Sequence, residues 1–448
     1  MTGALLDLLA DVLEGARKKG ATEADAYVGE DQSFSAQVRM GQVDTVKHAR
    51  DQHLALRVFV GRSAAAASTS DLSRESLGRL VDEAVTLARI TAPDPLSGLP
   101  EASALARAVP DLHLDDPTGH DLTPEAKIEL ARRCEGAALA FDPRITNSEG
   151  GDFSDGHARY AYATSHGFAG EYRTSSFSLS TSPLATDNGE MQRDGWYHVT
   201  RRHAGLDSPE EVGQTAARRA LRRLGARRVK TAEVPVIFDP QMAATLVRHI
   251  AGAAAGPALY RGASFLLNRL GQSIAAPSIT IVDDGTVPGA LGSRPFDGEG
   301  LPIQRTVLVD KGVLASYLLD SYSGRKLGLP STHHAARDGS GVSVSTTNLY
   351  LAAGDTAPEA LIGGVKNGLY VTELIGFGVN GVTGDYSRGA VGYWIENGEL
   401  AYPVEEITVA GNLLDMFQAV EGVGNDLVFR DRTAAPTLLI GRMVVAGA

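Results

Sequence analysis

A strand-to-helix segment near the middle of the chain, residues 234 to 271, most constrains the possible fold. It opens with the short apolar run 234–238 and breaks at Asp239-Pro240, after which residues 246, 249, 250 and 253 share one helical face. Only alanine and glycine occupy residues 251–256, so another backbone can approach this part of the helix closely. We therefore expect a short strand followed by a tightly packed helix, with His249 on or beside its inward face.

The surroundings of His249 lack the other residues of a helical zinc site. A metallopeptidase helix of that kind places a second histidine one turn from the first and a glutamate beside it, because two imidazoles chelate zinc and the carboxylate activates water. Here Ile250 follows His249, and Ala253 and Ala254 stand one turn further on. We predict no metal site in this chain, and His249 is more typical of a satisfied core histidine than of a ligand.

Composition narrows the class of protein. A length of 448 residues favours two domains, each with its own core. The formal net charge of −12 argues against direct nucleic-acid binding, which depends on cationic contacts to phosphate. The single cysteine, Cys134, excludes an internal disulfide. No secretory signal is recognisable, since Asp7 and Asp11 interrupt the first apolar residues, and no membrane span is expected. These features predict a cytoplasmic protein.

The first half of the chain alternates between helical and strand patterns. Helices are expected from residue 5 to Gly20, over 73–90, over 124–139 and from the capping box at Ser208 to Gly225. Residues 24–60 read as several short strands, 26–28, 34–40, 43–48 and 53–60, and alternating strands return over 145–182. We therefore predict an N-terminal α+β domain over residues 1–225, made of an antiparallel sheet with flanking helices.

Beyond the basic stretch 225–230 the chain becomes glycine-rich. A strand is expected over 278–283, and two-residue turns predict hairpins at Asp310-Lys311-Gly312 and at Asn397-Gly398. A short helix is expected over 413–420 and a last strand over 437–445. Residues 231–448 thus predict a C-terminal, mostly antiparallel β domain with a few helices.

Two polar clusters have simple structural interpretations. His333-His334 lies in the polar loop 330–341, and adjacent histidines point in different directions, so a metal role is less favoured than a surface or substrate-loop role. The basic cluster between Arg218 and Lys230 fits a solvated helix face near a C-terminus better than a nucleic-acid patch. A surface facing a protein partner is the alternative.

Glycines recur between β-like pieces over residues 363–398. A strand of this kind lets another backbone approach, so an extended substrate could add as a further strand, held by main-chain hydrogen bonds. The candidate substrate-binding residues are Tyr370, Thr372, Gly376 and Gly378. A glycine-rich barrel corner or bulge explains the pattern equally well.

Several long motifs resemble the TldD/PmbA family. They include 283–286 with 297–300, the segment 370–389 with its Asn380-Gly381-Val382-Thr383-Gly384-Asp385 run, and 393–398, and the N-terminal half matches over 68–77 and 94–100. The resemblance extends over essentially the whole chain with the motifs in the same order.

The resemblance implies a role in peptide hydrolysis. TldD-type subunits of this family carry His-Glu-x-x-x-His on the first helix of the C-terminal domain, bind zinc there and use a cysteine near the C-terminus. Aligned at His249, this chain has Ile250 and Ala254 instead, and residues 424–433 contain no cysteine. Residues 248–253 and 259–266 are similar to the PmbA type, also called TldE. That type pairs with TldD in a heterodimeric peptidase acting on small or unfolded peptides and peptide precursors, so zinc is expected in the TldD-like partner.

Two other functions remain open from the sequence. A self-sufficient hydrolase with a non-standard site would require His249, His333 and His334 to converge in space. A non-enzymatic adaptor would capture peptides without cutting them, as a homodimer. The residues alone do not decide between these and the heterodimeric peptidase.

Overall fold

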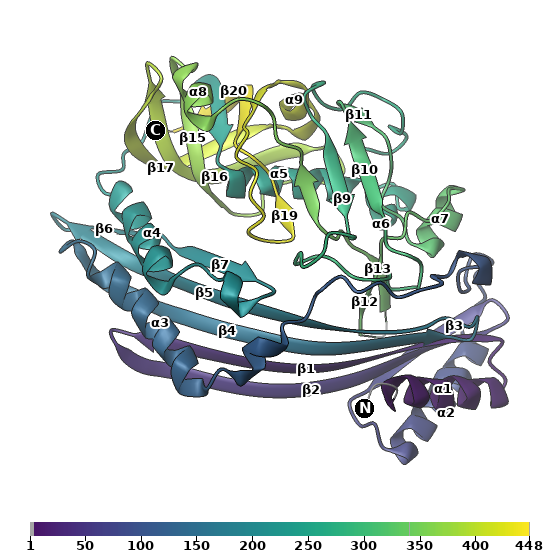
Figure 1. Ribbon diagram of the computed structural model, residues 1–448. Helices are drawn as coiled ribbons and strands as arrows, with labels where there is room; N and C mark the ends of the chain where they lie inside the picture. Colours follow the sequence, from purple (N-terminus) through teal and green to yellow (C-terminus); the bar gives the residue numbers. More distant parts are fainter. Residues whose placement is uncertain (1–3, 340, 448) are drawn as a thin grey trace.

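The computed structural model describes residues 4–339 and 341–447 (Figure 1). It is a mixed α+β structure, as predicted: the first half builds one large antiparallel sheet with helices, and the second half builds three smaller sheets. Within the described ranges, no helix combines the length and the apolar character that crossing a membrane would need. The predicted boundary near residues 225–231 falls in the connection between the two sets of sheets. The division into two domains stays a prediction.

The first sheet contains unusually long strands. Its order is β3-β2-β1-β4-β5-β6, with β7 also paired to β5. The strands are β1 (Glu23–Arg39), β2 (Gln42–Val60), β3 (Ser63–Thr69), β4 (Ile145–Thr164), β5 (Ala169–Asp187), β6 (Glu190–Arg193) and β7 (Trp196–Thr200). The separate short strands expected over residues 24–60 are wrong, because β1 pairs with β2 on one side and β4 on the other through its polar middle. Pairing with these neighbouring strands keeps the polar middle of β1 in the strand, although its sequence alone indicates a break between two strands.

Four helices cover this sheet close to where the patterns predict them: α1 (Ala4–Lys18), α2 (Arg74–Ile90), α3 (Pro124–Leu139) and α4 (Pro209–Arg222). Side chains of Ser73, Thr123 and Ser208 cap three of them by accepting backbone N–H bonds. Helices α1 and α2 share one apolar core with the sheet, while α3 and α4 contribute to two others. Cys134 is buried on α3, and burial raises the pKa of its thiol, which makes it a packing residue.

A closed ring of strand pairings forms the centre of the second half. Strand pairs run from β8 through β15, β16, β17 and β20 back to β8, and β18 adds to β20. These strands are β8 (Ala232–Phe238), β15 (Asn367–Ile375), β16 (Asp385–Glu396), β17 (Glu399–Asn412), β18 (Val420–Val423) and β20 (Leu438–Ala446). The predicted hairpin at Asn397-Gly398 is confirmed, with both turn residues at positive φ, 52° and 84°.

A five-stranded sheet and several short elements complete the second half. The sheet order is β11-β10-β9-β14-β19, and β12 pairs with β13. The strands are β9 (Ile281–Asp284), β10 (Arg305–Asp310), β11 (Val313–Leu314), β12 (Ala335–Asp338), β13 (Gly341–Val344), β14 (Leu349–Leu351) and β19 (Thr433–Ala434); the helices are α5 (Pro240–Ala253), α6 (Gly256–Tyr260), α7 (Ser321–Leu327), α8 (Pro358–Gly363) and α9 (Leu413–Gln418). The hairpin at Asp310-Lys311-Gly312 is confirmed. Helix α5 packs between the ring and this sheet, against β8 and β15 on one side and β14 and β19 on the other.

Figure 1 shows the second half seated above the hollow of the curved first sheet. Polar side-chain contacts join the two halves. Arg337 pairs with Asp25 of β1 at 2.7 Å, and Arg325 donates to the carbonyl oxygens of residues 96, 98 and 99. Arg223, the C-cap residue of α4, pairs with Glu373 of β15 at 2.6 Å. For Arg223 the expected solvated helix face is therefore wrong, because this side chain bridges to the second half.

Candidate functional site

Helix α5 is positioned by the strand that the sequence predicts and by an N-cap at the predicted break. Strand β8 ends at Phe238, Asp239 accepts the N–H of Met242 at 2.8 Å, and Pro240 occupies the first turn. The predicted strand-to-helix connection is therefore confirmed. Residues 246, 247 and 250 are buried, while Arg248 and Gly252 are exposed, so one face of the helix points away from the core.

His249 lies at the border of that exposed face. Its ring meets the ring of Tyr386 edge-on with centroids 6.2 Å apart. The His249 Nε2, the Tyr386 hydroxyl and the Arg388 Nε are buried and have no hydrogen-bond partner within the described residues. Burial lowers the pKa of His249, and the charges of Arg388 and Arg248 add to this effect, so the imidazole is neutral near pH 7. His249 thus packs as expected, but its Nε2 is not satisfied.

The positions aligned with the TldD-type zinc motif do not fit a metal. Ile250 is 1% exposed and Ala254 is fully buried, and both side chains belong to the main apolar core of the second half. Zinc sites take nitrogen, sulfur or carboxylate ligands, and one imidazole with two hydrocarbon side chains does not supply them. In the parts of the chain that the structure describes, no group of three or more His, Cys, Asp or Glu residues could hold a metal ion.

A cavity of about 570 Å³ opens beside the first turns of α5. Its walls come from α5, from the loop after β18 and from Trp196 and Tyr197 of β7. Arg219 and Arg430 lie over the Trp196 ring, at 5.1 and 4.7 Å from its centroid. Asp239 also lines this cavity, and burial raises the pKa of its carboxyl group from 3.8 to about 7. Residues 424–433, where the family resemblance leads one to expect the cysteine of a TldD-type subunit, contribute Asp426, Arg430 and Asp431 to this cavity.

The candidate strand for substrate addition is only partly open. Tyr370 of β15 pairs with Ile237 of β8 on one side and Tyr393 of β16 on the other, so no further strand can add there. From Thr372 onward, β15 pairs with β16 alone, and a bulge marks this point. The substrate-binding role stays a prediction, and the available backbone begins at Thr372.

Both glycines predicted at this site adopt special geometry. Gly376 has a φ of +81°, and a Cβ atom on Gly378 would lie 1.9 Å from the carbonyl oxygen of Ser387. The glycine-rich corner that the sequence also allowed therefore explains both residues. Tyr370 also lines the cavity beside α5, where it is half-buried.

His333 and His334 point in different directions, as expected. His334 is buried, with its Nε2 3.2 Å from an oxygen of Asp283 and its Nδ1 2.9 Å from the hydroxyl of Thr332. The Nδ1 of His333 lies 2.6 Å from the carbonyl oxygen of Pro302. Neither histidine shares a hydrogen-bond partner with His249 among the residues described. A joint catalytic role of the three histidines has no support in these contacts.

Sequence reasoning missed the residues that surround His249. Tyr386 and Arg388 come from β16, far along the chain from α5, and only the strand pairings of the ring bring them together. The signal available in the sequence was the motif 385–389, which carried the family resemblance but no assigned role.

Comparison with known proteins identifies the family of this chain. Three family profiles match in order: PmbA/TldA metallopeptidase domain 1 over residues 24–88, the central domain over 117–224 and the C-terminal domain over 231–447. The Metalloprotease PmbA of Escherichia coli O157:H7 is 41% identical over 424 residues, which cover 95% of this chain and 92% of that protein.

Solved structures show the same fold. A Bacteroides thetaiotaomicron protein, provisionally described as a modulator of DNA gyrase, superposes with a TM-score of 0.91 at 30% identity, covering 99% of this chain and 98% of that one. TldE from Thermococcus kodakarensis has a TM-score of 0.88 at 20% identity, covering 98% of this chain and all of that one (100%). Profiles, identity and fold agree over nearly the full length, and the chain belongs to the PmbA/TldD metallopeptidase family.

Proposed function

We propose that this chain is the PmbA/TldE-type subunit of a zinc-dependent peptidase and works in the cytoplasm with a TldD-like partner. The partner supplies zinc and activates water, and this chain helps to enclose the cleft in which small or unfolded peptides and peptide precursors are cut. In isolation the chain forms a homodimer through the surface that otherwise meets the partner.

The observation that carries this proposal is which residues occupy α5 and its C-cap. Ile250 and Ala254 are buried in the apolar core at the positions where the TldD type has its glutamate and second histidine. Restoring ligands there would place charged or polar side chains in a packed core, at a cost of several kcal/mol. The helix therefore favours a structural over a metal-binding role, while the name of the E. coli relative supports a peptidase as the final activity.

An exposed apolar tip at the connection from β15 to β16, formed by Ile375, Phe377 and Val382, supports the need for a partner. Beyond the bulge of β15, the side chains of Ile375 and Val382 are 54% and 52% exposed and Phe377 is fully exposed. Phe377 and Tyr386 line the same shallow pocket, which places the tip next to His249 and its unpartnered polar atoms. Clustered apolar side chains on a surface are typical of protein interfaces.

The test is reconstitution with a TldD-like subunit. The purified chain alone should contain no stoichiometric zinc by elemental analysis and should cleave no unstructured peptide. Mixed with the TldD-like subunit, it should co-elute in gel filtration, and the mixture should cleave peptides in a chelator-sensitive manner.

Two results would overturn the proposal. One is stoichiometric zinc in the chain alone together with peptidase activity that is lost in His249→Ala. The other is absence of both a complex and any gain in cleavage on mixing, which would favour the non-enzymatic adaptor.

A further inference from the structure

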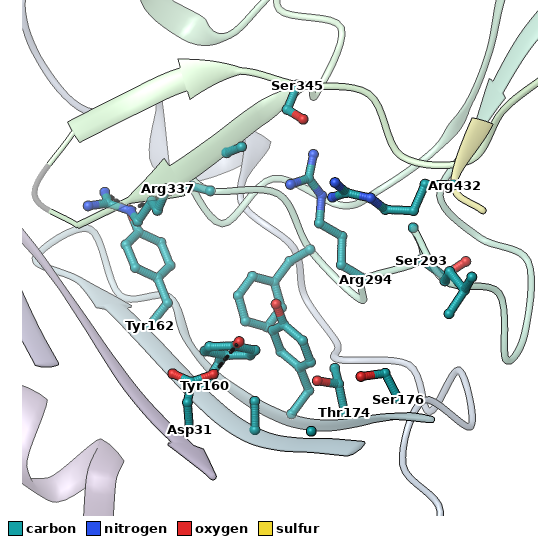
Figure 2. A pocket seen from close by; sticks show the side chains of 18 of the residues that line it. Asp31, Tyr160, Tyr162, Thr174, Ser176, Ser293, Arg294, Arg337, Ser345 and Arg432 are labelled. Carbon is teal, nitrogen blue, oxygen red and sulfur yellow. Dashed lines mark hydrogen bonds between the residues drawn. The ribbon is translucent and has the colours of Figure 1, made fainter. Parts of the chain in front are cut away.

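A second cavity lies away from α5, between the first sheet and the loops of the second half (Figure 2). It has a volume of about 620 Å³. Strands β1, β4 and β5 provide its floor, and residues 291–298, the β12–β13 hairpin and Arg432 provide its roof. A volume of this size suits a small molecule.

Four arginines line the cavity: Arg201, Arg294, Arg337 and Arg432. Only two carboxylates, Asp31 and Asp297, stand among the lining residues. This excess of positive charge occurs in a protein whose formal net charge is −12, so the general composition does not explain it.

Both carboxylates are already engaged elsewhere. Asp31 accepts the hydroxyl of Tyr160 at 2.8 Å, which Figure 2 shows at the floor of the cavity. Asp297 is buried and accepts the backbone N–H groups of Glu299 and Leu301, both at 2.9 Å. Burial, reinforced by the nearby charge of Glu299, raises the pKa of Asp297 to about 7. This carboxyl group is therefore partly neutral near pH 7, although the charge of Arg294 acts on it and favours its ionised form.

One of the four arginines is neutralised by an ion pair. Arg337, whose side chain is 3% exposed, pairs with Asp25 at 2.7 Å and lies over the ring of Tyr162. Its Nη1 is nevertheless buried without a hydrogen-bond partner in the described residues. Arg337 is therefore held in place in the wall of the cavity, and its Nη1 is the donor atom without a partner.

The other three arginines have no ion pair within residues 4–339 and 341–447. Arg201 is held by the carbonyl oxygens of Ser175 and Leu291, at 2.9 and 2.6 Å, which leaves its buried Nε without a partner. Both Nε and Nη2 of Arg294 are buried and unpartnered. Figure 2 shows the side chains of Arg294 and Arg432 among those that line the cavity. Burial lowers the pKa of Arg201, and the positive charge of Arg432 lowers it further.

This arrangement is costly in the free protein. Buried charged donors without acceptors destabilise a fold, and like charges held together repel each other. An anion placed between the guanidinium groups would satisfy the free donors and remove the repulsion, since guanidinium binds carboxylate and phosphate oxygens in paired hydrogen bonds. Hydroxyl groups of Thr174 and Ser176 line the same space and add neutral donors, whereas those of Ser293 and Ser345 already donate to backbone carbonyl oxygens.

We propose that this cavity binds a small anion with at least two negative charges on phosphate or carboxylate groups, held by Arg201, Arg294 and Arg432. The site is separate from α5 and does not depend on the TldD-like partner.

Titration calorimetry of the purified full-length chain tests the proposal with two probes, inorganic pyrophosphate and citrate, in a chloride buffer. We expect one-to-one binding of at least one probe, weakening as salt rises because the contacts are ionic. Tighter binding of pyrophosphate would assign the site to phosphate compounds, and tighter binding of citrate would assign it to polycarboxylates. Acetate, with one charge, should bind far more weakly than either.

Variants locate the binding in this cavity. The double variant Arg294→Gln, Arg432→Gln should lose at least about tenfold in affinity, because each change removes charged hydrogen bonds to the anion. Arg50→Gln, on an exposed part of β2, removes the same charge outside the cavity and should bind like the unmodified chain. Because the double variant relieves repulsion, its ligand-free thermal midpoint should not fall. Absence of binding by both probes at millimolar concentration would overturn the proposal, as would unchanged affinity in the double variant.

Discussion

Two titratable side chains on and beside α5 illustrate what burial does to single residues. Burial disfavours the charged form, so it raises the pKa of the Asp239 carboxyl group and lowers that of the His249 imidazole. Both groups are driven toward neutrality, yet their effects on stability run in opposite directions with pH. Because the two pH dependences are opposite, the protonation of both groups can be tested by measuring unfolding free energy, without knowledge of a substrate.

Asp239 should make the protein less stable as pH rises. Its pKa is raised from 3.8 to about 7, so the folded chain holds a proton that the unfolded chain releases, and this contribution is lost as pH rises through about 7. Asp239→Asn keeps an N-cap acceptor and should gain stability relative to the unmodified chain between about pH 5 and 8. Asp239→Ala should lose about 1 kcal/mol from the missing cap. Urea unfolding at several pH values measures both, and an Asn variant with an unchanged pH slope would contradict the assignment.

His249 should have the reverse effect. Because its folded pKa lies below its unfolded value, the unfolded chain takes up the proton first, and stability is lost as pH falls through the unfolded value of about 6.5. His249→Gln should reduce the loss of stability between about pH 7 and 5. The control His48→Gln, on an exposed position of β2, should leave that loss unchanged. Equal slopes in both variants would show that His249 is not the responsible group.

At the level of elements, tight turns could be predicted from the sequence, but the strands that pair with each other could not. The turns at Asn397-Gly398 and Asp310-Lys311-Gly312 were predicted because two residues determine their geometry. The continuous strand β1 was missed because its polar middle is stabilised by β2 and β4, which the sequence does not reveal as neighbours. Ring closure by β17 and β20 likewise depends on register between segments distant in the chain.

The tip between β15 and β16 is the element that should contact the partner. Phe377→Asp places a charge at the centre of the exposed apolar surface and should weaken the complex with the TldD-like subunit by at least about tenfold. Met191→Asp is the matched control, since Met191 is 65% exposed at another hairpin, between β5 and β6. Gel filtration and calorimetry of the mixed subunits measure the effect. Equal affinity of the two variants would place the interface elsewhere.

At the scale of the whole molecule, one buried charge cluster links the halves. Asp25 of β1 pairs with Arg57 at 2.5 Å and with Arg337 of the second half at 2.7 Å, and it accepts the Tyr162 hydroxyl at 3.1 Å. Asp25→Ala would leave the buried Arg337 without its ion pair and Arg57 with only the more distant Glu299, at 3.8 Å, so we expect a loss of about 3–5 kcal/mol in unfolding free energy. Asp51→Ala, on the exposed part of β2, should change stability by less than about 0.5 kcal/mol.

The shape of the unfolding curve adds a second check on this link. If Asp25 joins the halves, the unmodified chain unfolds in one transition, and Asp25→Ala separates the loss of the first sheet from that of the ring. Tryptophan fluorescence follows Trp196 in the first sheet and Trp394 in the ring, so Trp394→Phe and Trp196→Phe variants report each part separately. A fully preserved single transition in Asp25→Ala would contradict the linking role.

The arginine-lined cavity shows why a site built from distant segments of the chain cannot be predicted from the sequence. Arg201 follows β7, Arg294 lies in a loop after β9, and Arg432 precedes β19. No spacing rule connects them, and the basic cluster that the sequence does display, around Arg218 to Lys230, lies outside this cavity. Only the seating of the second half on the first sheet brings these charges together.

The place of β20 in the ring has a consequence for protein synthesis. This strand, Leu438–Ala446, lies between β8 and β17, so β8 is made roughly 200 residues before its partner leaves the ribosome. The nascent second half therefore has two unpaired strand edges, on β8 and β17, until β20 emerges. A chain truncated before β20 would have an open ring with exposed strand edges, which chaperones and proteases can distinguish from the closed ring.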